Sequence, residues 1–320
     1  MSRTSRTPHA PYPVPHEATA RRLEWAFLPP NLRAYVERRC GSPVVEAISQ
    51  TSGFTPGFAS VLVCEDGSRH FVKAASVKAQ RLFAESYREE ARKLGALPAD
   101  VPAPRLLWHL DDDWVVLGIE HVEARTPHRP WRDDDLAALL DALEETADLL
   151  TPPPAGLELV DAAEDMAPLA DGWAAVREAR PDLPHLDDAE ALARRLDEVV
   201  GGDTMVHTDV RSDNVLIDAD GRALLCDWNW PVRGCAWFDS FAALIAPRGE
   251  GIDVDAVLAS RRLLRDVPAE SIDIMLAMYA GYFLSQCEQS VPPTSPHLRD
   301  HQRWQGEVCW AWLAERRGWS

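Results

Sequence analysis

Three polar residues with the spacing of a phosphoryl-transfer site stand in one short stretch of the chain. Asp209 is followed five positions later by Asn214, and Asp227 comes eighteen positions after Asp209. Phosphoryl transfer in kinases needs a carboxylate that orients the attacking hydroxyl. It also needs an amide oxygen and a second carboxylate that hold magnesium on the nucleotide. Apolar runs at 215–217 and 224–226, joined by a turn at 218–221, predict a hairpin that would supply all three groups.

A chance match is the alternative explanation of this pattern. Asp and Asn are common in loops because they cap helices and tolerate turn geometry. A single H-x-D-x4-N match in a chain of 320 residues is therefore weak by itself. The flanking apolar runs favour the catalytic interpretation, because they match a path of loop, strand, turn and strand.

The composition limits the class of protein. A length of 320 residues suits one two-lobed domain or two domains, and 46% hydrophobic residues is ordinary for a soluble protein. We expect a cytoplasmic protein, because no apolar run reaches the roughly 18 residues of a membrane span and no signal peptide is visible. A net charge of −18 argues against nucleic-acid binding and is compatible with a cationic substrate, although an acidic surface often serves only solubility.

The cysteines predict neither a metal site nor a disulfide framework. No two of them form a C-x-x-C pair, so we interpret them as buried or incidental thiols. They are Cys40, Cys64, Cys226, Cys235, Cys287 and Cys309.

The first part of the chain predicts a small antiparallel sheet with a helix. Residues 1–16 should be a disordered tail, because they are rich in Pro, Ser, Thr and Arg. Residues 17–122 should form an N-terminal lobe. Its five expected strands are 44–50, 60–64, 69–74, 105–110 and 114–119, and its main helix spans 77–97.

Two features of this lobe could contact a nucleotide. The turn between the first two strands carries Ser52, Gly53 and Gly57, and a Gly-bearing turn can lay backbone amides over a phosphate. A plain hairpin turn is the alternative. Glu90 lies on the apolar face of the helix and needs a cationic partner, for which Lys73 is the candidate.

Residues 123–320 should form a mostly helical second lobe. Helices are expected at 133–150, 187–200, 254–264, 271–289 and 302–317, and the three prolines at 152–154 open a variable region. The fold class predicted is thus α+β, with a five-stranded antiparallel sheet and a helix in a small lobe and helices in a larger one.

The order of these features resembles the protein-kinase-like fold, and within it the aminoglycoside phosphotransferase family of small-molecule kinases, which includes choline kinases. The resemblance covers 44–244. It is carried by His207-Thr208-Asp209 through Asn214, by Asp227-Trp228, by Phe238-Asp239 and by Glu89-Glu90-Ala91.

The resemblance implies a role for each matching residue. Asp209 would accept the proton of the substrate hydroxyl, and Asn214 and Asp227 would bind magnesium. In the N-terminal lobe, Lys73 would hold the phosphates of ATP and pair with Glu90, and residues 52–57 would cover those phosphates. The segment from Glu120 to Val122 would offer backbone groups to the adenine; GTP is not excluded.

Arg211 carries a hypothesis of our own. It stands two positions after Asp209, where protein kinases keep a lysine near the transferring phosphate. A cation there could stabilise charge that develops in the transition state. We therefore count Arg211 among the catalytic candidates.

The chain departs from the family pattern, and the acceptor stays open. Many members carry His-Gly-Asp followed by His-Pro-Gly-Asn, where this chain has Thr208 and Arg211-Ser212-Asp213. The expected acceptor is a small-molecule hydroxyl, with an aminoglycoside or another amino-bearing alcohol as the first candidate and choline, an amino sugar or homoserine as others. A non-catalytic nucleotide-binding protein and a protein kinase are the competing functions. The oligomeric state cannot be inferred.

Overall fold

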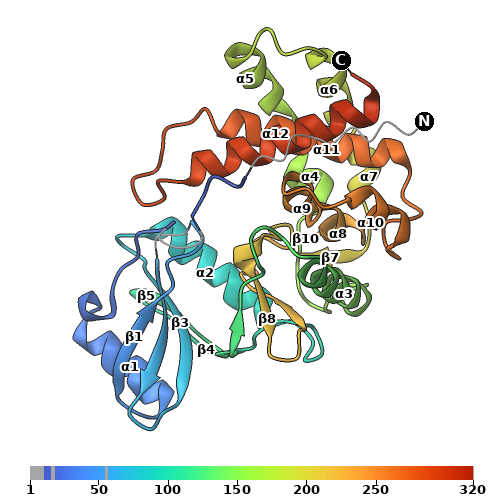
Figure 1. The fold of residues 1–320 in the computed structure, drawn as a ribbon. Coiled ribbons are helices and arrows are strands. Elements are labelled where there is room, and N and C mark those ends of the chain that lie inside the picture. The colour runs from blue at the N-terminus through green and yellow to red at the C-terminus, as the bar shows by residue number, and fades with distance from the viewer. Residues whose placement is uncertain (1–10, 16–18, 55–56, 320) are drawn as a thin grey trace.

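The computed structural model describes residues 11–15, 19–54 and 57–319, and it confirms the predicted α+β class (Figure 1). A five-stranded antiparallel sheet forms the N-terminal part, with the strand order β1-β2-β3-β5-β4. The strands are β1 (Val44–Ser49), β2 (Phe58–Cys64), β3 (Arg69–Ser76), β4 (Leu106–Asp111) and β5 (Trp114–Ile119). Lys73 lies in the middle of β3, opposite Ala59 of β2 and Leu117 of β5.

Two helices accompany this sheet. The short 3-10 turn η1 (Trp25–Phe27) leads into α1 (Pro30–Cys40), which begins at a proline and ends at Gly41 with φ of 87°. Helix α2 (Arg81–Leu94) packs on β3 and β5. It begins four residues later than predicted, because Gln80 first closes a turn onto the Ser76 carbonyl oxygen, 2.8 Å away.

The C-terminal part is mostly helical, as predicted (Figure 1). Its helices are α3 (Asp133–Leu149), α4 (Ala162–Met166), η2 (Ala167–Asp171), α5 (Gly172–Ala179), α6 (Leu186–Ala193), α7 (Asp197–Val200), η3 (Ser212–Asn214), α8 (Phe238–Ala242), α9 (Ile245–Gly249), α10 (Val254–Ser260), α11 (Ala269–Gln286) and α12 (Leu298–Arg317). Helices α11 and α12 lie side by side and bury Trp312 completely.

Two small sheets hold the segments between these helices. One pairs β7 (Thr204–Val206) with β10 (Val232–Gly234), and the other has the order β6-β8-β9, formed by β6 (Ala124–Arg125), β8 (Val215–Asp218) and β9 (Ala223–Leu225). Strands β8 and β9 are the hairpin predicted from the apolar runs. The pairs β7–β10 and β6–β8 join segments far apart in the chain, so no local pattern predicts them.

Other expectations need correction. The helix predicted at 187–200 is interrupted by turns between α6 and α7, and the variable region after the prolines contains α4 and α5. Part of the tail predicted to be disordered is packed: Val14 is buried, and the Tyr12 hydroxyl lies 2.6 Å from Nδ1 of His301. Residues 1–10 and 16 of that tail lie outside the described residues.

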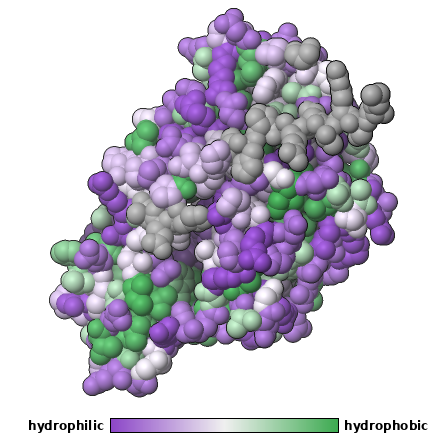
Figure 2. All heavy atoms as spheres, in the orientation of Figure 1, coloured by the Kyte–Doolittle hydropathy of each residue, from purple (hydrophilic) through white to green (hydrophobic). Residues whose placement is uncertain are grey.

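Hydrophilic residues cover most of the face shown in Figure 2, and a hydrophobic patch marks the region of the N-terminal sheet and α1. Exposed Val45 and Ile48 of β1 are among the large apolar side chains on the surface. Within the described ranges, no helix is both long and apolar enough to cross a membrane.

Candidate active site

The loop before β8 is held by a buried carboxylate. Asp239, in the first turn of α8, accepts hydrogen bonds from the backbone amides of His207 at 2.6 Å and Thr208 at 2.9 Å. Burial raises the pKa of Asp239, although His207 and these amides oppose the shift. Thr208 adopts φ of 68°, a left-handed conformation in which many members of the resembled family carry glycine. Asp239 therefore fixes the strained turn that presents Asp209.

His207 joins this loop to the end of β9. Its Nε2 lies 2.8 Å from the Cys226 carbonyl oxygen, and its Nδ1 accepts from the Asp209 amide at 3.3 Å. These two contacts assign the proton to Nε2, because Nδ1 must be free to accept. The ring is buried and contacts Trp228 edge-on, so His207 acts as a support for the loop.

The Asp209 side chain is oriented from two sides. Nδ2 of Asn214 donates to the Asp209 carbonyl oxygen at 2.9 Å and to its Oδ2 at 3.0 Å. Arg211 donates to Oδ1 of Asp209 and binds Asp213 through two further nitrogens at 3.0 Å. Since the Asn214 amide nitrogen faces Asp209, its oxygen is the atom available to a metal.

Lys73 of β3 connects helix α2 to the segment that follows β9. Its Nζ donates to both carboxylate oxygens of Glu90, at 2.7 and 2.9 Å, and to Oδ1 of Asp227. Burial would raise the pKa of Asp227, but the charge and hydrogen bond of Lys73, with Arg211 and His207, together hold that pKa below its ordinary value. Burial raises the pKa of Glu90 to about 7, because one ammonium cannot fully compensate two buried carboxylates.

A cavity of about 340 Å³ runs from the sheet to these groups. Its lining includes the predicted nucleotide and metal residues Ser52, Gly53, Lys73, Glu90, Glu120, Val122, Asn214 and Asp227. The Glu120 amide already donates to the Arg105 carbonyl oxygen at 2.8 Å, so an amide offered to a base in this segment would come from His121 or Val122.

A second cavity of about 790 Å³ opens on the other side of Asp227. Of these two cavities, Asp209 and Arg211 line only the second, whereas Phe54 and Asp227 line both. Its walls carry six aromatic side chains, namely Phe54, Phe83, Trp230, Tyr279, Tyr282 and Phe283. Tyr279, Tyr282 and Phe283 come from α11, whose apolar sequence predicted a helix but no cavity.

Arg129 and Glu250 were also missed. They form an ion pair that is almost fully buried, and Glu250 also accepts from the Trp131 amide at 2.6 Å. Arg129 donates to Ser212 Oγ at 3.0 Å, three residues after Asp209 in the loop before β8. The Arg129 guanidinium also stacks over the Tyr12 ring. The two residues lie more than 100 positions apart, so only their contact reveals the support that they give to the loop.

Gly57 does not line either cavity but lies against Tyr87 beneath the turn. A Cβ at Gly57 would overlap the Tyr87 hydroxyl.

Gly57→Ala should therefore displace the turn and raise the KM for the nucleotide more than it lowers kcat. Tyr87→Phe in the same chain should restore much of the loss, because it removes the overlapping oxygen. Gly201→Ala is a control at a position with open space and φ of −65°, and steady-state kinetics would measure all variants. An unchanged KM in Gly57→Ala would contradict this prediction.

His301 should make the stability depend on pH. Burial, with help from Arg211, lowers the pKa of His301 to about 3, against 6.5 in the unfolded chain. Below pH 6.5 His301 is protonated in the unfolded chain but not in the folded chain. The free energy of unfolding therefore falls by ~1.4 kcal/mol for each pH unit of acidification. His301→Gln should flatten this loss, as measured by urea unfolding at pH 7 and 5. The exposed His109→Gln should not, and equal slopes for both variants would contradict the prediction.

The sequence matches the model of the Phosphotransferase enzyme family over residues 57–270. No curated protein matches it. Among solved structures, similarity extends to a thermostable mutant of aminoglycoside phosphotransferase APH(4)-Ia with ADP and hygromycin B, with 15% identity, a TM-score of 0.57, and 88% of this chain and 98% of that chain covered.

Two further structures share the fold. Choline kinase LicA from Streptococcus pneumoniae has 14% identity and a TM-score of 0.57, with 87% of this chain and 99% of that chain covered. Spectinomycin phosphotransferase APH(9)-Ia, in complex with ADP and spectinomycin, has 11% identity and a TM-score of 0.57, with 89% and 98% covered. At these identities the structures establish the fold, and the family match spans more than half of the sequence. The chain belongs to the phosphotransferase enzyme family.

Proposed function

We propose that this protein uses ATP and magnesium to phosphorylate a hydroxyl of an amino-bearing small molecule with an apolar face. The observation that carries the proposal is the position of Asp209. It lines the larger cavity, which shares Asp227 and Phe54 with the cavity that contains Lys73. A hydroxyl beside Asp209 would thus lie next to a phosphate held at Lys73.

The donor atoms fit the proposed cofactors. The Asn214 amide oxygen and the Asp227 carboxylate are the hard oxygen ligands that Mg²⁺ prefers, and both residues line the smaller cavity. Magnesium bound there would neutralise charge on the terminal phosphates. Ser52 and Gly53 at the turn would cover the phosphates, and Glu120 to Val122 would bind the base.

In the proposed reaction the chain contributes orientation, proton transfer and charge. Asp209, fixed by Asn214, accepts the proton of the acceptor hydroxyl. At the same time the hydroxyl oxygen of the acceptor attacks the terminal phosphorus of ATP in line. A phosphate ester and ADP are the products. Arg211 restrains the Asp209 carboxylate and would place positive charge beside the reacting phosphate.

Arg211→Ala should lower kcat by about 10²-fold or more and change nucleotide affinity little. The expected split follows because Arg211 lines the acceptor cavity but not the nucleotide cavity. Arg222→Ala, in the exposed turn of the β8–β9 hairpin, is a matched control. Unchanged turnover in Arg211→Ala would contradict a catalytic role.

The cavity walls guide the choice of acceptor. Six aromatic rings would favour an apolar or singly cationic body, because cations bind well over aromatic faces. Apart from Asp209 and Asp227, the carboxylates that line this cavity are those of Glu85 and Glu89. Glu89 is paired with Arg92 at 2.7 Å. The acidic residues Asp161, Glu164 and Asp165 of the C-terminal part do not line this cavity. Aminoglycosides thus stay candidates, with less cationic amino alcohols preferred.

The first experiment is ADP release from ATP and magnesium across a panel of aminoglycosides, other hydroxyl-bearing antibiotics, choline, amino sugars and homoserine. We expect at least one acceptor to stimulate release, with no stimulation in Asp209→Asn. A protein that binds no nucleotide would overturn the proposal in favour of a non-catalytic role. Phosphate that enters proteins but no small molecule would favour a protein kinase.

A further inference from the structure

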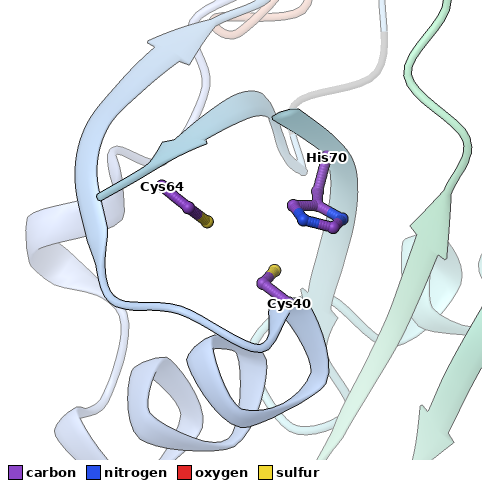
Figure 3. Close-up of side chains that lie close together, drawn as sticks. All are labelled: Cys40, Cys64 and His70. Carbon is purple, nitrogen blue, oxygen red and sulfur yellow. The ribbon is translucent and has the colours of Figure 1, made fainter. Parts of the chain in front are cut away.

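A second cluster of chemically active side chains lies in the N-terminal part, outside both cavities. Cys40, Cys64 and His70 each offer one ligand atom, and these atoms lie within 4.8 Å of one another. Figure 3 shows the two thiols and the imidazole ring pointing into one space between the end of α1 and the β2–β3 hairpin. The sequence spacing did not predict this site, because the three residues form no C-x-x-C pair and meet only through tertiary packing.

Helix packing explains the position of Cys40. Leu32, Val36 and Cys40 recur at intervals of four on α1, so they lie along one face of the helix. Leu32 and Val36 are buried in the core cluster between α1 and the sheet, and Cys40 is packed against that cluster. Cys40 thus ends an apolar stripe, where the helix meets the hairpin.

Strand register explains the other two positions. Leu62 of β2 pairs with His70 of β3, and Cys64 stands two residues after Leu62. Side chains two apart share a face of a strand, so Cys64 and His70 are diagonal neighbours on the face that packs against α1. The three ligands therefore come from three elements whose packing is fixed by buried Leu62.

The surroundings of the cluster favour a cation. Cys64 is only 2% exposed, while Cys40 and His70 are half-buried. The carboxylates of Glu37 and Asp66 lie near enough to Cys40 to act on it electrostatically. Negative charge at this distance would stabilise a divalent cation in the same space.

We propose that Cys40, Cys64 and His70 bind one zinc ion, with a water molecule in the fourth position. Two sulfurs and one nitrogen are ligands that Zn²⁺ prefers, in tetrahedral geometry. Zinc–sulfur bonds of ~2.3 Å place two sulfurs ~3.8 Å apart, which requires only a small adjustment of side chains. Binding displaces one proton from each thiol.

The bound ion would tie the end of α1 to the β2–β3 hairpin. Strand β3 also carries Lys73, three residues after His70, so the ion would stabilise the strand that presents the nucleotide-binding lysine. Because the folded chain alone offers this site, zinc should raise the Tm of the protein. The proposal is independent of the acceptor and of the catalytic roles assigned above.

The test uses the full, reduced, metal-free chain and zinc titrated in competition with a chromophoric chelator. We expect one zinc per chain in the wild type. Cys40→Ser, Cys64→Ser and His70→Gln should each bind about tenfold more weakly or worse. Cys287→Ser removes a buried thiol of the helical part and should bind like the wild type. Co²⁺ should give the intense visible absorption of a tetrahedral thiolate site in the wild type and in Cys287→Ser alone.

Two outcomes would overturn the proposal. One is zinc binding that is equal in the wild type and in all three ligand variants. The other is a protein that forms a Cys40–Cys64 disulfide and binds no zinc after reduction. Mass spectrometry of non-reduced peptides would detect this disulfide in protein purified without reductant, and it would form equally in His70→Gln. His70→Gln separates the two chemistries, because it keeps both thiols and removes only a metal ligand.

Discussion

Asp209→Asn is expected to lower kcat by about 10³-fold and to leave nucleotide affinity nearly unchanged. The substitution keeps the size of the side chain and removes its ability to accept a proton. Asp209 lines the acceptor cavity but not the nucleotide cavity, so the loss should fall on turnover. Steady-state ADP release and nucleotide titration measure the two quantities separately.

The fold should survive this substitution. Arg211 keeps its contacts with Asp213 at 3.0 Å, and the Asn214 amide keeps the Asp209 carbonyl oxygen as an acceptor. Asp218→Asn is the matched control, because it neutralises a carboxylate of the same hairpin that binds only turn amides. Full activity in Asp209→Asn would remove Asp209 from the mechanism, and equal loss in both variants would point to the hairpin's stability.

Lys73→Met is expected to abolish measurable turnover and to destabilise the protein by about 3–5 kcal/mol. The ammonium is the shared partner of Glu90 and Asp227, and Glu90 is 1% exposed. Without Lys73, a buried carboxylate is left uncompensated beside a second one, and the nucleotide phosphates lose their cation. Urea unfolding and ADP release test the two effects.

A second substitution distinguishes the electrostatic explanation from a packing defect. Lys73→Met with Glu90→Gln should recover part of the stability, because the unpaired charge is gone, but it should recover no activity. The exposed Lys78→Met should change neither quantity. If the double variant is no more stable than Lys73→Met, uncompensated charge is not the cause of the loss.

Local chemistry made much of this molecule readable from its sequence. The strands expected at 60–64 and 69–74 form the β2–β3 hairpin, and the apolar face of α2 places Glu90 towards the sheet. The spacing of Asp209, Asn214 and Asp227 predicted a hairpin that carries all three. These predictions succeeded because each depends on residues close together in the chain, where backbone geometry fixes the direction of a side chain.

Other features depend on contacts between distant segments. Asp239 reaches the loop at His207 from 32 residues away, and Arg129 meets Glu250 across 121 residues. The packing of α11 places three of its aromatic side chains in the wall of the larger cavity. The packing of α1 on the β2–β3 hairpin brings Cys40, Cys64 and His70 together. The sequence by itself determined the fold class and the hairpin next to Asp209, Asn214 and Asp227, because these follow from local periodicity and spacing. The tertiary structure decided the acceptor cavity and the thiol–imidazole cluster, because long-range packing has no local pattern.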